Sequence, residues 1–277
     1  MQICQTDQGL ARLEEHDGAP VLAILDVAQS NLHEVLAQSS VAALAEAQAK
    51  QLVPPAEATL KTLLPNAGRF VIAGMNYHAH CEEIGHAVPD RLIFGSAPGS
   101  ATHSAGADIL IPADHPDEVD YEGEIGVVIS QSAEQISADD AWSVVAGLLP
   151  LNDVSARDVQ AAGTLEAVWK AKGFPGFKPH GPYLATLDAF PNPLDIGLTT
   201  HVNGELRQSG RSSDMIFPIP EIIARVTARI PLQAGDVICT GTPGGVAHGG
   251  KFPYLRPGDT VEIRLEGQPS LRNTFVA

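Results

Sequence analysis

Two acidic side chains stand at alternate positions where a run of apolar residues begins. Glu122 and Glu124 lead into residues 125–129, whose β-branched side chains are typical of a buried strand. Alternate side chains of extended backbone point to the same face, so both carboxylates are expected to enter the core together. A buried carboxylate is costly unless it is paired with a cation or coordinates a metal. No Lys or Arg stands near enough in the sequence to pair with either one.

Carboxylate oxygens suit hard cations, so the pair is a candidate site for Mg²⁺, Mn²⁺ or Ca²⁺. A third ligand follows downstream, where an apolar segment that begins at Ala146 ends abruptly in Asn152 and Asp153. With Asp153, three carboxylates would hold one divalent ion and leave positions for water or a chelating substrate. The alternative is an exposed strand face on which Glu122 and Glu124 are simply solvated.

Three motifs of this chain resemble the fumarylacetoacetate hydrolase family in both order and spacing. They are Asp120-Tyr121-Glu122-x-Glu124, Asn152-Asp153-Val154-Ser155-Ala156-Arg157-Asp158 and Thr240-Gly241-Thr242-Pro243-x-Gly245-Val246. Several motifs in the right order are far more specific than a single pair of glutamates. The resemblance runs from about Phe70 to the C-terminus.

The resemblance implies an α+β fold, a mixed β-roll of the family's C-terminal type with flanking helices, preceded by a small N-terminal α+β domain. It also implies a homodimer that uses Mg²⁺ or Mn²⁺, with Ca²⁺ as a further candidate. The expected reaction is the hydrolysis of a carbon-carbon bond in a small β-diketo acid, either an acylpyruvate or a fumarylacetoacetate-like compound. Decarboxylation of the oxaloacetate type, isomerisation of the 2-hydroxy-diene-dioate type and a non-catalytic ligand-binding homologue remain open.

A histidine and a glutamate follow a predicted strand that begins at Phe70. If a helix begins at Asn76, His80 and Glu83 lie one turn apart and their side chains can meet. A carboxylate that orients an imidazole makes it a better general base. The family element Asn-Tyr-x-x-His-x-x-Glu is complete here, which implies catalytic roles for His80 and Glu83 and a substrate contact for Tyr77.

Two other interpretations of this segment stay open. The polar residues could be incidental at the start of a surface helix. His78, His80 and Cys81 could also bind zinc, although the sequence has no second cluster at the spacing of a structural zinc site.

The resemblance assigns five more residues to the active site. Arg157 and Gln160 would face the substrate, and the planar guanidinium of Arg157 suits a carboxylate. An ion pair of Arg157 with Asp158 or another acid is the competing interpretation. Lys172 stands at the position of the family's catalytic lysine, where it would stabilise the charge that develops on the reacting carbonyl. Gly241 and Thr242 would contact the substrate through a glycine-rich loop.

The chain departs from the family at two places. Gly173 and Pro175-Gly176 follow Lys172 where Ser and Asp-Thr are frequent, and this puts the substrate pocket in more doubt than the lysine. Ser96 stands near the position of a lysine that many members carry. Where that lysine helps to bind a substrate carboxylate, its absence weakens any assignment to the same α-keto acids.

The composition bounds the class of protein. The chain has 277 residues, 44% hydrophobic and 18% charged, which is an ordinary globular composition. A net charge of -16 argues against a basic surface for nucleic acid or an anionic membrane. Three widely separated cysteines fit reduced thiols in a cytosol. With no apparent signal peptide and no apolar run of roughly 20 residues, we expect a cytoplasmic protein.

Residues 1–65 are expected to form a small N-terminal domain, ahead of a catalytic domain over residues 66–277. Asp17-Gly18 separates two apolar segments and predicts a hairpin turn. Asn31 with Glu34 predicts a capped helix that runs to Lys50. Further on, Asn203-Gly204 predicts a second hairpin.

Overall fold

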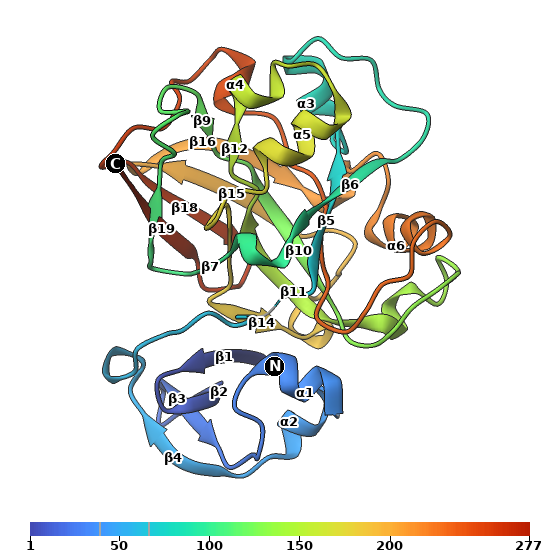
Figure 1. Cartoon of the computed structure of the whole chain (residues 1–277). Coiled ribbons are helices and arrows are strands. Elements are labelled where there is room, and N and C mark those ends of the chain that lie inside the picture. Colours follow the sequence, from blue (N-terminus) through green and yellow to red (C-terminus); the bar gives the residue numbers. More distant parts are fainter. Residues whose placement is uncertain (39, 66) are drawn as a thin grey trace.

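The computed structural model describes all residues of the chain except 39 and 66. It is an α+β fold of mixed sheets with few helices, as predicted. One large sheet runs through the molecule, and a second sheet packs against its middle strands (Figure 1).

The N-terminal strands form one end of the large sheet. They are β1 (Gln2–Thr6), β2 (Gly9–His16), β3 (Ala19–Leu25) and β4 (Ala49–Val53). The β2–β3 hairpin turns at Asp17 and Gly18, with φ of 52° and 77°, which confirms the predicted turn. The strand β1 pairs with β14 (Tyr183–Ala185), so the sheet continues into the rest of the chain.

The predicted helix from Asn31 to Lys50 is only partly right. Asn31 Oδ1 accepts a hydrogen bond from the Glu34 amide at 3.1 Å, as a cap should. The helix α1 ends early (Leu32–Gln38), α2 is a single turn (Ala43–Glu46), and Lys50 lies in β4. Pairing of β4 with β3 supplies hydrogen bonds that outweigh the favourable helix propensity of this Ala-, Leu- and Gln-rich run.

The remaining strands of the large sheet bring the functional segments together. In sheet order they are β14, β11 (Val145–Asn152), β10 (Gly123–Ile129), β17 (Val237–Cys239), β5 (Arg69–Gly74) and β6 (Ile93–Pro98), with β13 (Lys178–His180) beside β11 and β7 (Thr102–Ser104) beside β13. Ile3 and Leu25 share one hydrophobic cluster with Phe70 and Leu149. The N-terminal strands and the catalytic segment thus share a sheet and a core, and the domain boundary at residue 65 stays a prediction.

The second sheet has the order β16 (Glu205–Arg211), β15 (Gly197–Val202), β18 (Thr260–Leu265), β19 (Leu271–Val276) and β8 (Asp108–Leu110). The hairpin between β15 and β16 turns at Asn203 and Gly204, with φ of 53° and 84°, as predicted. Ile125 and Val127 of β10 lie in one cluster with Leu198 and Ile263 of this sheet. A short ladder joins β9 (Val119–Asp120) to β12 (Ser155–Ala156).

Helices α3 (His78–Glu83), α4 (Arg157–Gln160) and α5 (Leu165–Ala171) gather near the end of β6, whereas α6 (Ile219–Thr227) lies apart from them (Figure 1). Short 3₁₀ turns are η1 (Pro55–Glu57), η2 (Gly99–Ala101), η3 (Ala141–Val144), η4 (Leu187–Ala189), η5 (Ser212–Asp214) and η6 (Ala247–Gly249). Helices α3, α4 and α5 carry or adjoin predicted site residues: His80 and Glu83 on α3, Arg157 and Gln160 on α4, and Lys172 just after α5.

Candidate active site

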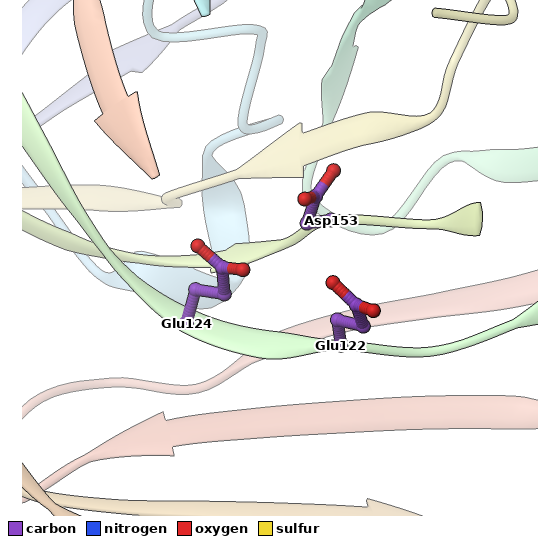
Figure 2. Close-up of side chains that lie close together, drawn as sticks. All are labelled: Glu122, Glu124 and Asp153. Atoms are coloured by element: carbon purple, nitrogen blue, oxygen red, sulfur yellow. The ribbon is translucent and has the colours of Figure 1, made fainter. Parts of the chain in front are cut away.

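The antiparallel pairing of β10 and β11 places three carboxylates side by side. Gly123 pairs with Asn152, and the Asp153 amide donates to the Glu122 carbonyl at 2.9 Å. Oxygen atoms of Glu122, Glu124 and Asp153 all lie within 4.8 Å of one another, and all three residues are buried (Figure 2). The predicted same-face arrangement is confirmed, and the alternative of a solvated strand face is wrong.

Because Gly123 has no side chain, the start of β10 lies close to the second sheet. A Cβ atom at position 123 would lie 2.0 Å from Oγ1 of Thr200 on β15. Any larger residue would push β10 away from β15 and shift the two flanking glutamates.

Buried cations compensate two of the three carboxylates, although no Lys or Arg is close to Glu122 or Glu124 in the sequence. Arg157 Nη2 lies 2.6 Å from Glu122 Oε1. Lys172 Nζ donates to Glu122 Oε2 at 2.6 Å, to Asp153 Oδ2 at 2.8 Å and to Ser155 Oγ at 2.8 Å. These cations are 35 and 50 residues from Glu122 in the sequence, so sequence proximity did not reveal them.

A second lysine, which sequence reasoning missed, lies behind Asp153. Lys178 is completely buried, and its Nζ lies 2.6 Å from Asp153 Oδ1. This contact is an ion pair without hydrogen-bond alignment, and the ammonium also donates to the carbonyls of Lys172 and Phe177. Asp153 is therefore held between two ammonium groups.

Glu124 has no such partner. Among the described residues, no Lys or Arg nitrogen lies within ion-pair distance of Glu124, whose Oε2 accepts only the Gly241 amide at 2.9 Å. Burial, followed by the charges of Asp153 and Glu122, raises the pKa of Glu124 well above its usual value.

The neighbouring glutamate is shifted in the opposite direction. Burial would raise the pKa of Glu122, but Lys172 and Arg157 outweigh it and hold the pKa below its usual range. Burial would likewise lower the pKa of Lys172, but the charges of Asp153 and Glu122 raise it. The three cations all lie on Glu122 and Asp153, so Glu124 is the member of the triad without an ion-pair partner.

This donor set fits a divalent ion. Each carboxylate oxygen has two lone pairs, so an oxygen that accepts a lysine proton can still coordinate a metal. An all-oxygen set is the one that Mg²⁺ and Mn²⁺ prefer. A cation beside Glu124 would also offset the repulsion from Asp153 and Glu122, which adds to the effect of burial on its pKa. Glu122, Glu124 and Asp153 are therefore the residues that would hold the ion.

The predicted histidine dyad forms on α3. His80 Nδ1 lies 2.9 Å from Glu83 Oε1, and Glu83 Oε2 accepts the Gly245 amide at 2.7 Å. His80 is 6% exposed, and its Nε2 has no hydrogen-bond partner within the described part of the chain. The histidine is therefore oriented through one nitrogen and available through the other.

The helix start was predicted two residues too early. The helix α3 begins at His78, because the Asn76 side chain is buried and binds backbone groups instead: it donates to the Thr240 carbonyl at 2.8 Å and accepts the Phe217 amide at 2.9 Å. Cys81 is buried with its Sγ on the Met75 carbonyl. The acidic triad is the one cluster with metal-ligand spacing found in the described residues, so the zinc interpretation has no support.

A cavity of about 280 Å³ opens beside the triad. The predicted site residues that line it are His80, Glu122, Glu124, Arg157, Gln160, Lys172, Gly241 and Thr242. Glu83 and Asp153 are not among the described lining residues, but they contact His80 and Lys172, which are. Tyr77 is buried and is not among the lining residues that the structure describes, so its contact with substrate stays a prediction. Trp169 and His248 also line the cavity and carried no sequence signal.

Arg157 forms a structural ion pair, although not with Asp158. Its Nε donates to Asp120 Oδ2 at 2.9 Å, and its Nη1 donates to Gln160 Oε1 at 2.9 Å. Asp158 instead contacts His115 at 2.6 Å. The predicted role of Arg157 and Gln160 in binding substrate remains a prediction.

The glycine-rich loop after β17 contributes to the triad. The Gly241 amide donates to Glu124, and Thr242 Oγ1 donates to the Gly123 carbonyl at 2.9 Å. Gly241 has φ of 93°, a conformation that glycine adopts without strain. Both residues line the cavity, and their contact with substrate stays a prediction.

Comparison with known proteins identifies the family. The family model described as fumarylacetoacetate (FAA) hydrolase C-terminal matches residues 69–276. The chain therefore belongs to the fumarylacetoacetate hydrolase family, which confirms the resemblance inferred from the motifs. No helix among the described residues is long and apolar enough to cross a membrane.

Three solved structures show how closely the whole chain follows this fold. A fumarylacetoacetate hydrolase from the psychrophile Exiguobacterium antarcticum is 31% identical, with a TM-score of 0.82 over 99% of this chain and 98% of that chain. A 2-hydroxyhepta-2,4-diene-1,7-dioate isomerase from Mycobacterium marinum is 28% identical, with a TM-score of 0.80 over 100% and 98%. A maleylpyruvate hydrolase from Sphingobium sp. SYK-6, in complex with manganese(II) and pyruvate, is 26% identical, with a TM-score of 0.77 over 100% and 99%.

Proposed function

We propose that this protein is a hydrolase that depends on Mg²⁺ or Mn²⁺ and cleaves a carbon-carbon bond in a small β-diketo acid, an acylpyruvate or a fumarylacetoacetate-like compound. The observation that carries the proposal is the buried triad of Glu122, Glu124 and Asp153, uncompensated at Glu124, in the same cavity as His80. Ca²⁺ is a further candidate ion, because it accepts the same ligands.

The bound ion would supply Lewis-acid polarisation of the substrate's oxygens. Residues of the chain would activate the attacking water. His80, oriented by Glu83, takes a proton from water at Nε2 as the water oxygen adds to the acyl carbonyl carbon. The carbon-carbon bond then breaks, and the leaving carbon takes the proton back from His80. For an acylpyruvate, the products are a carboxylic acid and pyruvate.

Lys172 would act through the ligands as well as on the substrate. It donates to two triad carboxylates, so it fixes their spacing, and its charge lies beside the position where negative charge develops. The maleylpyruvate hydrolase with manganese(II) and pyruvate supports both the ion and the product class.

Two other reactions of the family remain candidates for this chain. The similarity to the Mycobacterium marinum isomerase favours an isomerase of the 2-hydroxy-diene-dioate type, and oxaloacetate-type decarboxylation is the other candidate. Neither of these reactions consumes water, whereas the orientation of His80 Nε2 toward an open cavity suits the activation of water.

The direct test is an assay of the purified protein with Mg²⁺ or Mn²⁺ against acylpyruvates, oxaloacetate and diene-dioates, in isotopically labelled water. We expect cleavage of an acylpyruvate, with label in the carboxylic acid product and loss of activity in chelator. Turnover of oxaloacetate or a diene-dioate alone would replace hydrolysis by decarboxylation or isomerisation. Binding without any turnover would favour a non-catalytic homologue. The homodimer is likewise a proposal, which light scattering would test.

A further inference from the structure

The cavity has two walls of opposite character. The charged wall consists of Glu122, Glu124, Arg157 and Lys172. The apolar wall consists of Ile93 on β6 and Leu165, Val168 and Trp169 on α5. The glutamates lie at the start of β10 and Arg157 lies on α4, whereas most of the apolar wall lies on α5, which Lys172 directly follows. A ligand in the cavity meets both walls.

The side chains of the apolar wall are in close proximity. A Cβ atom at Gly74 would lie 3.9 Å from Ile93 Cγ2 and 4.0 Å from Trp169 Cη2. The Trp169 ring covers Gly95 so closely that a Cβ there would lie 2.1 Å from its Cε2. Gly95 is therefore what allows the indole to lie flat against β6 beside Ile93.

The cavity offers no free Lys or Arg for a second carboxylate. Arg157 and Lys172 are the Lys and Arg residues among its described lining, and both donate to buried acids. Burial lowers the pKa of His248, which disfavours its charged form. His86 also lines the cavity, but it is exposed and its Nδ1 lies 2.7 Å from the Ala87 carbonyl.

Leu165 is unusual on the apolar wall because its side chain is 68% exposed. It lies in the first turn of α5, on the rim of the cavity. An exposed leucine one helical turn before the half-buried Trp169 offers apolar surface to a ligand in the cavity.

We infer that the substrate is an acylpyruvate whose acyl group is uncharged and apolar, and that this tail binds against Ile93, Leu165, Val168 and Trp169. This rests on the proposed function, because it takes an acylpyruvate as the ligand. A carboxylate at the end of the tail would lose its hydration among apolar side chains without gaining a cation. A methyl group there would gain contact area instead.

The test compares two ligands that differ only at the tail's end. Butanoylpyruvate ends in a methyl group, and succinylpyruvate has a carboxylate in its place, with the chelating half unchanged. Calorimetric titration into the Mn²⁺-loaded His80→Asn variant, which lacks the proposed base, should give at least about tenfold tighter binding for butanoylpyruvate. This variant should bind the ligands without hydrolysing them, and the wild-type assay reports turnover separately, so failure of the proposed reaction and failure of this inference are distinguishable.

A positive charge on the rim of the cavity should reverse the preference for butanoylpyruvate over succinylpyruvate. Leu165→Arg should tighten succinylpyruvate binding by about tenfold and weaken butanoylpyruvate binding. Leu206→Arg is the matched control, because Leu206 is 51% exposed on β16 and does not line the cavity. Equal affinities with Leu165 intact, or a preference for succinylpyruvate, would overturn the inference. An unchanged ratio in Leu165→Arg would remove Leu165 from the tail site.

Discussion

The charged wall of the cavity combines two glutamates at the start of β10 with Arg157 on α4 and Lys172 just after α5, whereas the apolar wall is built on a two-turn helix and an edge strand. Each buried group of the charged wall has fixed partners: Lys172 donates to three acceptors, and Glu122 receives two cations. The apolar wall is held by packing, and its outermost member, Leu165, is largely exposed.

The two walls meet two different physical requirements of the same site. Groups that handle charge need fixed positions, and a network of buried ion pairs on a sheet supplies them. Groups that only have to exclude water and contact a tail can tolerate substitution. We therefore expect substitutions in the charged wall and its dyad to affect kcat and metal binding, and those in the apolar wall to affect substrate preference.

The largest effect should come from the histidine. His80→Asn removes the general base without touching a triad residue, so kcat should fall by roughly 100- to 10,000-fold while Mn²⁺ affinity stays nearly unchanged. Steady-state kinetics and calorimetry measure the two quantities. His78→Asn, on the exposed face of the same helix, is the control. An unchanged rate in His80→Asn would place the base elsewhere.

The next effect concerns the buried lysine of the charged wall. Lys172→Met leaves Glu122 and Asp153 with less compensation, so the metal-free protein should lose about 3–5 kcal/mol of unfolding free energy. We also expect kcat to fall much more than KM rises, because its charge acts mainly in the transition state.

Lys170→Met changes an exposed lysine on the same helix and should affect neither quantity. Chemical denaturation and kinetics together separate the two roles. A rise in KM alone would make Lys172 a carboxylate anchor, and no change in either constant would remove it from the site.

The third effect is a pH dependence of unfolding free energy and of Mn²⁺ affinity, and it results from the raised pKa of Glu124. Its pKa is raised in the metal-free fold, so the unfolded chain loses this proton at a lower pH than the folded chain. Unfolding free energy should therefore fall as pH rises from the usual carboxylate range toward the raised pKa. Over the same range Mn²⁺ affinity should rise, by up to roughly tenfold per pH unit, because binding releases the proton.

Glu124→Gln should abolish the stability part of this trend, since a neutral amide has no proton to lose. Denaturation midpoints of the metal-free protein across that range measure it. A wild-type profile that is flat, or that rises with pH, would show that Glu124 is already ionised.

The smallest effect belongs to the apolar wall. Leu165→Ala removes an exposed side chain, so stability should change by no more than about 0.5 kcal/mol. KM for butanoylpyruvate should still rise by about three- to tenfold, because apolar contact with the tail is lost. Leu206→Ala serves as the control. Thermal denaturation with kinetics tests the pair, and an unaltered KM would count against the tail site.

Local patterns were enough to predict much of the charged wall. Strict alternation put Glu122 and Glu124 on one face, and one helical turn put His80 next to Glu83. The hairpins at Asp17 and Asn203 followed from turn residues that accept positive φ. In each case the predicted contact depends on residues close together in the chain or on a motif with a strong local preference.

The contacts that sequence reasoning missed join residues that are far apart in the chain. Lys178 reaches Asp153 only because β13 lies beside β11, and Trp169 reaches Gly95 only because α5 packs on β6. The N-terminal strands join the large sheet through β1 and β14, which are far apart in the chain. No local propensity encodes such contacts, and the same pairing turned a predicted stretch of helix into β4.

The central claim is that the triad binds one divalent ion, and calorimetric titration of Mn²⁺ into metal-free protein tests it most directly. The wild type should bind one ion per chain, and Glu124→Ala should lose that binding, because it removes the carboxylate that has no other cation. Glu82→Ala, which removes an exposed acid on α3, should bind like the wild type. Undiminished affinity in Glu124→Ala would contradict the account.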